Sequence, residues 1–368
     1  MRSKTVNGIT VKYMDEIAFA FNPSIIQANG ENINRIDIDL SDDDSNSYSV
    51  SYYSYDDGCY ADVREYVQSC YDSMTFGDVD YSDIQLTKMG KKFAFKVYVI
   101  LEDGTETEFD FETFFIWGAL KAGSNEAYNS YRELTWFKNF PFTFGLFSTG
   151  GSMLLFSDGK AERVIRADNM GIYNVPLFVD TDNCNNYLSI KDFTGSLVEI
   201  TFDDTFDDTF RCSYDTSGTD KLKINVVDSS ADSGYYLRWV DRHGFYCYYL
   251  FKQGDEQRKV TSDGSFMRNN LLAYDASYGY KGYTGRQQMM TRQDTIPICV
   301  PSASSYLFDT LFDITTSPCV DLFSGYDSDG KPKWVSVTVD AGTYKKSREE
   351  LQDFICQITM PETEIQKL

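Results

Sequence analysis

The chain has 368 residues, of which 42% are hydrophobic and 16% aromatic, and its formal net charge is −22. This length exceeds one ordinary hydrophobic core, so we expect two or three domains, and the aromatic content argues against global disorder. The negative charge disfavours nucleic acid and anionic membranes as partners, because like charges repel. Abundant Tyr, Phe, Thr and Val with only 8 prolines favour β-strands.

The N-terminal residues lack the apolar segment and the small-residue cleavage site of a secretory signal. No run of about 18 consecutive apolar residues, the length that a membrane-spanning helix needs, occurs in the sequence. We therefore expect a protein made and folded in the cytosol. Its eight cysteines are scattered without CxxC pairs, which predicts reduced thiols, several of them buried.

Residues 1–149 are predicted to form a β-sandwich-like domain with one short helix. Residues 33–40 alternate strictly, which indicates a half-exposed antiparallel strand. Residues 61–74 change to helical spacing. The pair Asp103-Gly104 is a strong two-residue turn signal between two strands. Strands are also predicted in residues 17–26, with a break at Asn22-Pro23, and in residues 48–55, 93–102 and 105–111.

A Phe-rich segment follows at residues 137–147, FKNFPFTFGLF. Pro141 interrupts it, which indicates an edge strand or a connection. Gly150-Gly151 is a plausible boundary to a central β-sandwich domain, residues 150–296. Its strands are predicted at residues 153–156, 162–166, 175–179, 197–202 and 221–227.

The low-complexity run at residues 201–210, TFDDTFDDTF, has a period of four, which places its three Phe on one strand face. Its Asp residues could supply oxygens to calcium. Carboxylates in such a segment are more often its solvated edge, so we predict no metal site here.

The central hairpin is predicted at residues 235–251, YYLRWVDRHGFYCYYLF. Asp241 would open its turn and Gly244 would take a positive φ. Both faces of the second arm are apolar or aromatic, so we expect it to be covered on both sides.

Residues 267–292 are rich in Tyr, Gly, Asn and Gln and are predicted to form a long loop or an exposed ribbon. Its aromatic residues resemble a sugar-stacking surface, although a loop packed on the sheet or on a neighbouring subunit is the more ordinary interpretation. The C-terminal segment, residues 297–368, is predicted to hold strands at 318–323 and 334–339 and a helix at 306–312. Ser347 and Glu350 form a capping box that predicts a second helix at 351–355, before a terminal strand or arm at 358–368.

Few residues carry recognisable chemistry. His243 is the one histidine, and its turn beside Gly244 favours a structural or solvated role. No phosphate-binding loop, dinucleotide fingerprint or serine-hydrolase elbow occurs. We predict no catalytic, cofactor-binding or metal-binding residue, no cofactor and no enzymatic activity, although paired carboxylates of a glycosidase remain an alternative.

Three segments resemble structural proteins of tailed bacteriophages and prophages of Bacteroidales-type hosts. The first is the hairpin LRWVDRHGFYCYYLF at residues 237–251, which is similar to an LxWxxxxGxxxYxLF hairpin of tail-associated proteins. The second is TTSPCVDL at residues 315–322 with the strand at 334–339. The third is the closing helix with ITMPE at residues 358–362. The resemblance implies a virion component of the tail tip or baseplate, of the distal-tail type, and no catalytic residue.

Three functional classes stay open at this point: a virion subunit, a glycan-binding or adhesive module that could bind a host-surface glycan, and a glycosidase-type enzyme. We favour the first, a non-enzymatic subunit located in the virion. The 58 aromatic residues of the chain exceed what sandwich cores of this size can bury, so some should lie at the surface and form interfaces. We therefore expect a homo-oligomeric ring and contacts with other virion proteins. The candidate interface residues are Phe140, Phe142, Phe144, Tyr278, Tyr280 and Tyr283, together with the C-terminal arm.

Overall fold

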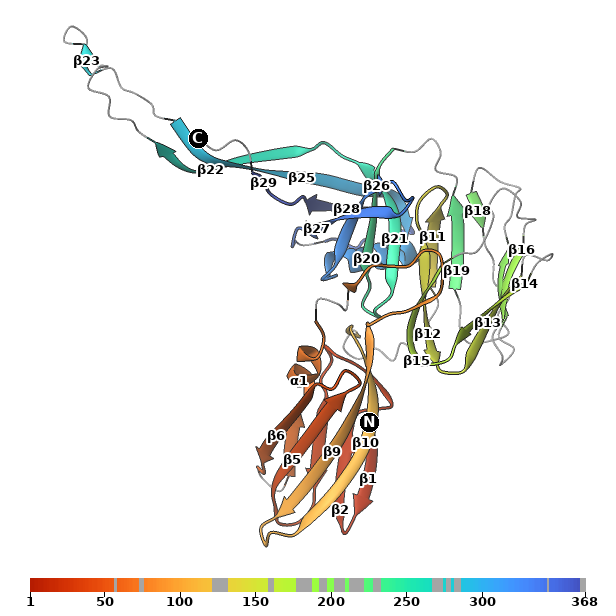
Figure 1. Cartoon of the computed structure of the whole chain (residues 1–368), viewed down its shortest axis with the longest axis vertical. Helices are drawn as coiled ribbons and strands as arrows, with labels where there is room; N and C mark the ends of the chain where they lie inside the picture. The colour runs from red at the N-terminus through yellow and green to blue at the C-terminus, as the bar shows by residue number, and fades with distance from the viewer. Residues whose placement is uncertain are drawn as a thin grey trace. The chain divides into compact units, whose positions relative to one another are not determined.

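The computed structural model describes residues 1–55, 58–72, 76–120, 132–157, 162–176, 187–191, 197–201, 209–211, 222–227, 233–266, 274–275, 279–280, 286–342 and 344–364. Within this part of the chain the prediction of mainly antiparallel β-structure is confirmed (Figure 1). The described α-helices are α1 (Arg64–Ser69) and α2 (Ser305–Phe312). Both correspond to helices that the sequence predicted.

The chain divides into two compact units, described separately below. Unit 1 comprises residues 1–231 and 239–249, and unit 2 comprises residues 232–238 and 250–368. The predicted boundaries at 149/150 and 296/297 both fall inside these units. The division into three domains therefore stays a prediction.

Unit 1 begins with a β-sandwich. One sheet has the order β1-β2-β4-β7 and the other the order β3-β10-β9-β5-β6, with β3 parallel to β10. The order β10-β9-β5-β6 matches strands G-F-C-C′ of an immunoglobulin-like sandwich, and β2-β4-β7 matches A-B-E. The strands are β1 (Arg2–Val6), β2 (Ile9–Tyr13), β3 (Ile17–Phe19), β4 (Ile25–Asn29), β5 (Ile33–Asp42), β6 (Ser47–Tyr53), β7 (Gly58–Asp62), β9 (Gly90–Leu101) and β10 (Glu106–Ile116).

The core of this sandwich follows the alternation of the sequence. Ile36, Ile38 and Leu40 of β5 are 0–1% exposed, as their shared face predicted. They belong to one buried cluster with Ile26 of the opposite sheet and Phe95 of the same sheet. Burial of one face of each sheet against the other is the main source of stability in such a sandwich.

The hairpin of β1 and β2 was not predicted. Asn7 and Gly8 connect the two strands, with φ of 50° and 79°. Two successive positive φ angles define the type I′ turn, for which Asn-Gly is the preferred pair. The signal was present in the sequence, but the predicted strands began only at residue 17.

The remainder of unit 1 contains three small sheets and part of the central hairpin. Their orders are β11-β19-β18, β12-β15-β8 and β14-β13-β16-β17. β11 and β19 run parallel, as β3 and β10 do, which departs from the mainly antiparallel pattern. The strands are β8 (Gln85–Leu86), β11 (Arg132–Phe137), β12 (Thr143–Thr149), β13 (Ser152–Ser157), β14 (Glu162–Ala167), β15 (Met170–Pro176), β16 (Tyr187–Lys191), β17 (Leu197–Thr201), β18 (Thr209–Arg211) and β19 (Leu222–Val227). Most of the predicted TFDDTFDDTF run, including the Asp residues considered for calcium, lies outside the described residues.

The central hairpin is confirmed as β20 (Tyr235–Val240) and β21 (Tyr246–Gln253), which are neighbours in the sheet order. Of the second arm, Tyr246, Cys247, Tyr248, Leu250 and Phe251 are each at most 8% exposed. Burial of adjacent residues requires cover on both faces, as the sequence predicted.

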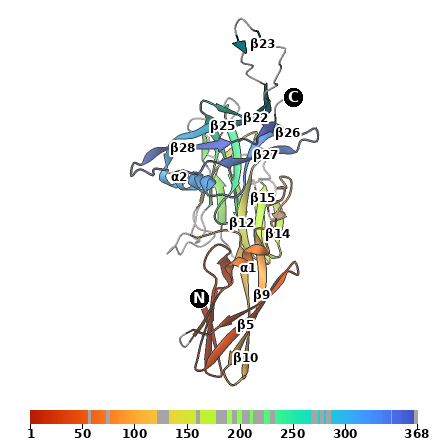
Figure 2. The ribbon, with the colours of Figure 1, turned by 90° about the vertical axis from the view of Figure 1, so that its left-hand side faces the viewer.

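Unit 2 is built on one sheet with the order β21-β20-β26-β27-β28-β25-β22, to which β29 is added beside β25. Helix α2 packs on this sheet through the edge-to-face rings of Phe308 and Phe354, and it lies beside β28 in Figure 2. The strands are β22 (Gln257–Phe266), β25 (Arg286–Ser304), β26 (Val320–Tyr326), β27 (Pro332–Val339), β28 (Leu351–Thr359) and β29 (Thr363–Glu364). A separate hairpin joins β23 (Tyr274–Asp275) to β24 (Gly279–Tyr280).

The predicted helix at residues 351–355 is wrong. The segment is the start of β28, in which Gln352, Phe354 and Cys356 are buried and Leu351 and Ile355 are exposed. Ser347 still caps locally, because its Oγ accepts from the backbone N–H of residue 349 at 3.0 Å. The apolar residues at 351, 354 and 355 also fit a helical stripe, so pairing with β25 and β27 decided between the two periods.

Candidate interaction surfaces

The turn of the central hairpin is a buried network around Asp241. The carboxylate Oδ1 of Asp241 accepts the backbone N–H of His243 at 2.9 Å and of Phe245 at 2.8 Å. The backbone N–H of Gly244, whose φ is +77°, donates to the Asp241 carbonyl. His243 is 6% exposed, with Nδ1 at 3.7 Å from Asp241 Oδ2. Both predicted turn roles are confirmed, and His243 lies inside the fold.

The hairpin is also packed tightly within unit 1. The Phe245 ring, which is fully buried, lies so close to Gly145 that a Cβ there would meet it at 2.2 Å. The Tyr248 hydroxyl and Thr143 Oγ1 are 2.9 Å apart. These contacts make the turn part of the hydrophobic core.

A buried cation organises the N-terminal sandwich. Nζ of Lys91 donates to Asp44 Oδ2 at 2.6 Å, to Asp42 Oδ2 at 3.2 Å and to the carbonyl of Cys70 at 2.6 Å. Its three donors therefore meet three acceptors, and Nζ also lies 5.5 Å from the centroid of the Tyr71 ring. The cluster ties the end of α1 to β9 and to the turn between β5 and β6.

The electrostatics of this cluster follow from its geometry. Burial opposes the charge on Lys91, but the hydrogen bonds that it donates to Asp44 and Asp42 outweigh that effect and raise the pKa of Lys91. In return, the hydrogen bond from Lys91 and its charge lower the pKa of Asp44. Because every strong group is satisfied internally, the cluster stabilises the fold and offers no site to a ligand.

A second buried ion pair lies in unit 2. Nε of Arg238 donates to Asp321 Oδ2 at 2.8 Å, and Ser336 Oγ donates to Asp321 Oδ1 at 2.9 Å. The Arg238 guanidinium lies 4.5 Å from the centroid of the Trp334 ring. Burial and the neighbouring Asp321 raise the pKa of Cys319 to about 12. This cluster joins β20, β26 and β27 and is again structural.

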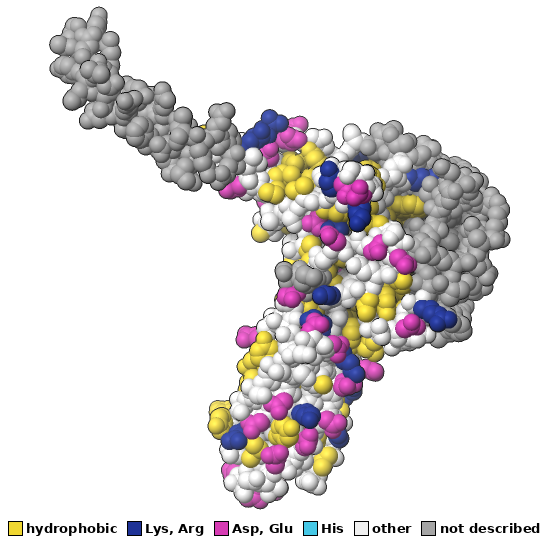
Figure 3. Space-filling model, viewed as in Figure 1, with side chains coloured by type: hydrophobic (Ala, Val, Ile, Leu, Met, Phe, Trp, Pro, Cys, Tyr) yellow, Lys and Arg dark blue, Asp and Glu magenta, His cyan; other side chains and the backbone are white. Residues whose placement is uncertain are grey.

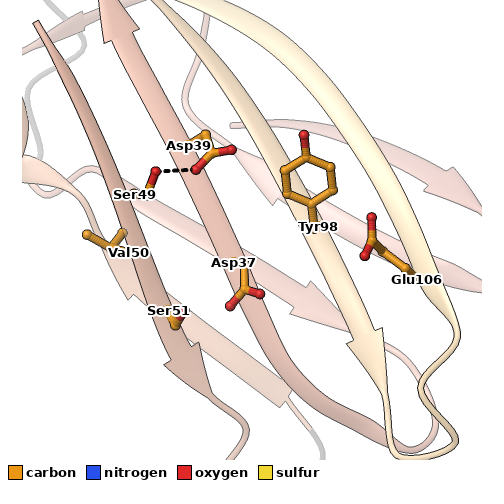
Figure 4. Close-up of a pocket in the computed structure, with 7 residues that line it drawn as sticks. All are labelled: Asp37, Asp39, Ser49, Val50, Ser51, Tyr98 and Glu106. Carbon is orange, nitrogen blue, oxygen red and sulfur yellow. Dashed lines mark hydrogen bonds between the residues drawn. The ribbon is translucent and has the colours of Figure 1, made fainter.

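The outer face of the β6-β5-β9-β10 sheet carries an open depression of about 400 Å³, drawn in Figure 4. We call it the carboxylate face, after Asp37, Asp39 and Glu106. The other residues that line it are Ser49, Val50, Ser51 and Tyr98. The register explains the grouping, because Asp37 lies opposite Ser51 and Tyr98, and Asp39 lies opposite Ser49.

Two of these carboxylates have partners within the sheet. Arg35 Nε lies 3.2 Å from Asp37 Oδ1, and Ser49 Oγ donates to Asp39 Oδ1 at 2.5 Å. Asp37 and Asp39 lie two residues apart on β5 and therefore point to the same face of the sheet. Acidic side chains are visible over this part of the molecule in Figure 3.

Exposed tyrosines lie at the end of β6. Tyr53 is 70% exposed and Tyr55 is 83% exposed, and Tyr60 of β7 is 56% exposed. Tyr53 belongs to the same outward series as Ser49 and Ser51. The predicted interface residues lie elsewhere in the chain, and the alternation of β6 is the sequence signal that could have located Tyr53.

A two-stranded ribbon extends from the sheet of unit 2 (Figure 1). We use "ribbon" for β22 and the part of β25 that pairs with it, from Gln257↔Thr295 to Phe266↔Arg286. Only the remainder of β25, from Thr295 onward, pairs with β28 in the described structure. The side chains of residues 257–261 are exposed, including Val260 at 54%.

The predicted interface residues fall in different places. Phe142 and Phe144 are 6% and 2% exposed, so their side chains are already packed in this chain, with Phe142 against Trp136. Phe140 is partly exposed. Tyr280 lies in β24, where the backbone alone is described. Tyr278 and Tyr283 lie outside the described residues. An interface role for this set stays a prediction.

The described cysteines agree with the thiol prediction. Cys59, Cys70, Cys247, Cys299, Cys319 and Cys356 are thiols. Burial raises the pKa of Cys356 to about 12 and that of Cys70 to about 11. The remaining two cysteines lie outside the described residues.

The described residues contain no group of three or more His, Cys, Asp or Glu placed to hold a metal ion. No helix among them is long and apolar enough to cross a membrane.

Comparisons with known proteins found distant structural likeness. No protein-family model matches the chain, and no curated protein matches it. One similar solved structure is the periplasmic chaperone SfaE, with a TM-score of 0.21, 11% identity, and coverage of 60% of this chain and 100% of that chain.

Two adhesin structures are also similar. A structure concerned with host cell surface retention of a 1.5-MDa bacterial ice-binding adhesin has a TM-score of 0.20, 11% identity, and coverage of 89% of this chain and 95% of that chain. A tetra-tandem repeat of the extending region of a large adhesion protein has a TM-score of 0.22, 14% identity, and coverage of 94% and 89%. At these TM-scores the likeness carries no argument about function.

Proposed function

We propose that this chain is a non-enzymatic structural subunit of a tailed-phage virion, at the tail tip or baseplate, which works by assembling with further protein subunits. The observation that carries the proposal is the ribbon of β22 and β25. A two-stranded ribbon is marginally stable in water, and in the described structure β29 adds a third strand to it only at Thr291 and Arg292. The side chains of residues 257–261, which alternate between the two faces of β22, are exposed, so docking on another subunit would supply further cover.

The sequence resemblance supplies the virion context for this proposal. The hairpin at residues 237–251, which carries that resemblance, is largely buried, so it serves the fold of the subunit and not its surface. The net charge of −22 would keep subunits apart until a specific partner is met.

The test of this function is assembly. The full chain is expressed alone and together with the products of neighbouring genes, and molar masses are measured by light scattering after size exclusion. We expect a defined oligomer or a stoichiometric complex, and we expect the chain in purified particles by mass spectrometry. A chain that stays monomeric with every neighbour and is absent from particles contradicts the proposal.

A second candidate function is glycan binding, favoured by the exposed rings of Tyr53 and Tyr55. Exposed aromatic rings stack on sugar faces, and the Ser and Asp side chains nearby on β5 and β6 can hydrogen-bond to hydroxyl groups. A glycan array probed with the wild-type chain and with Y53A/Y55A tests it. Glycan binding that the double substitution abolishes would favour this candidate, and an array without signal would oppose it.

A further inference from the structure

The ribbon has a charge opposite to that of the chain as a whole. The ribbon, residues 257–266 and 286–295, has four Lys and Arg against two Asp, a net charge of +2, while the whole chain has −22. Residues 1–118, which include the N-terminal sandwich, have nine Lys and Arg against twenty-two Asp and Glu, a net charge of −13. One copy of this chain thus presents both a cationic and a strongly anionic surface.

Two arginines of the ribbon lie on one of its faces, together with Asp294, whereas Lys259 lies on the other face. Arg258 lies opposite Asp294, and Val260 lies opposite Arg292, so alternation brings these residues to a common side. The side chains of Arg258 and Arg292 are 60% and 38% exposed. Each already contacts an acid, Glu256 at 3.3 Å and Asp294 at 2.5 Å respectively. These contacts hold the guanidinium groups in place at the surface.

The carboxylate face of the N-terminal sandwich has the matching chemistry. Asp39 and Glu106 are exposed there, and Asp37 is half-buried between them and Arg35. Arginine donates hydrogen bonds to carboxylates, and it also stacks on aromatic rings such as that of Tyr98. Because the carboxylate face is an open depression lined by carboxylate acceptors, the guanidinium groups of a protruding ribbon could enter it and donate to them.

We propose that the arginine side of the ribbon of one copy docks on the carboxylate face of a second copy of this chain. This inference rests on the proposed assembly function and names its contact. The two surfaces differ, so the interface is head-to-tail, and repetition of it produces a closed ring or an open filament. Each subunit would use its ribbon toward one neighbour and its carboxylate face toward the other.

The first experiment measures salt dependence. The full chain is examined by sedimentation velocity at about 0.1 M and about 1 M NaCl, which screen charges beyond about 10 Å and about 3 Å respectively. We expect the association constant to fall at least about tenfold at the higher salt concentration. Association that is unchanged or stronger at high salt would overturn the charge-based contact.

The second experiment uses two charge-reversed variants. R258E/R292E has an altered ribbon and an intact carboxylate face, and D39K/E106K has the reverse. We expect each variant alone to lose self-association, and an equimolar mixture to regain association, because intact ribbon then meets intact face. K12E/K333E, which reverses two exposed cations outside the ribbon, should associate like the wild type. Circular dichroism verifies that all variants remain folded.

The outcomes separate this contact from the broader function. Wild-type assembly that both ribbon and face variants retain would reject the contact and leave the structural function standing. A mixture that does not regain association would also reject it. A wild-type chain that remains monomeric alone and with its neighbouring gene products would reject both.

Discussion

Replacement of Lys91 by Met should destabilise the N-terminal sandwich far more than any exposed ion pair would suggest. The substitution removes all three hydrogen bonds of Nζ and leaves the Asp42 carboxylate, whose side chain is 0% exposed, without its cation. Breaking a buried pair by removing one partner costs about 3–5 kcal/mol.

The structure places this variant at the lower end of that range. Asp42 keeps three further hydrogen bonds, from the backbone N–H groups of Asp44 at 3.1 Å and Asn46 at 2.8 Å and from Asn46 Nδ2 at 2.8 Å. We therefore expect a loss of about 3 kcal/mol in the free energy of unfolding. The double variant K91M/D42N also removes the negative charge of Asp42, and should recover about 1 kcal/mol or more of the lost free energy of unfolding.

Lys92 is the matched control, because it is adjacent in sequence and also pairs with an acid. Its pair with Glu112 is exposed, with side chains 48% and 60% accessible, so K92M should cost less than about 1 kcal/mol. Native-state hydrogen exchange of peptides from β5 and β9 measures the loss in this sandwich separately from unit 2. Equal effects of K91M and K92M, or no recovery in K91M/D42N, would refute the reasoning.

Three further predictions follow from the same structure. F354A should lower the free energy of unfolding by about 3–5 kcal/mol, because Phe354 is 1% exposed. I355A, at a position 59% exposed, should change it by less than about 0.5 kcal/mol. Similar losses for the two variants in a denaturant titration would contradict the strand assignment of β28. Thiol titration of denatured, unreduced protein should find all eight cysteines, and disulfide pairing among them would contradict this expectation. In the native protein Cys299, which is partly exposed, should react before Cys356, whose pKa is raised to about 12 by burial. Because Lys91 lowers the pKa of Asp44 from 3.8, the stabilisation from this pair is present above about pH 4 and is lost as the pH falls through the lowered pKa. Measurement of the free energy of unfolding at decreasing pH should show this loss in the wild type and a smaller loss in K91M.

Local signals in the sequence were sufficient for the elements whose geometry depends on neighbouring residues. Asp103-Gly104 produced the β9–β10 turn, and Gly104 has the positive φ, 82°, that this turn requires. The alternation of β5 placed its buried face correctly, and the turn chemistry of Asp241 and Gly244 located the central hairpin. Asn7-Gly8 carried the same kind of information and could have predicted the first hairpin.

Most of the candidate surfaces could not be predicted from the sequence, for a different reason. Whether an aromatic side chain is exposed depends on what other elements cover it. Phe142 and Phe144 looked available in a Phe-rich segment, yet both pack into the core of their own unit, while Tyr53 and Tyr55 remain exposed. The carboxylate face likewise exists only because pairing of β5 with β6 and β9, and of β9 with β10, brings Asp37, Asp39 and Glu106 to one side of a sheet.

The sequence by itself therefore determined the β class, the principal turns and the faces of the strongly alternating strands, since these depend on residues one to four positions apart. The tertiary structure alone decided that residues 351–359 form a strand, because the apolar residues at 351, 354 and 355 fit a helical stripe and only pairing with β25 and β27 selects the strand. It alone also brought Lys91 to Asp42, 49 residues away in the chain, because no local pattern specifies which distant charges will share a buried site.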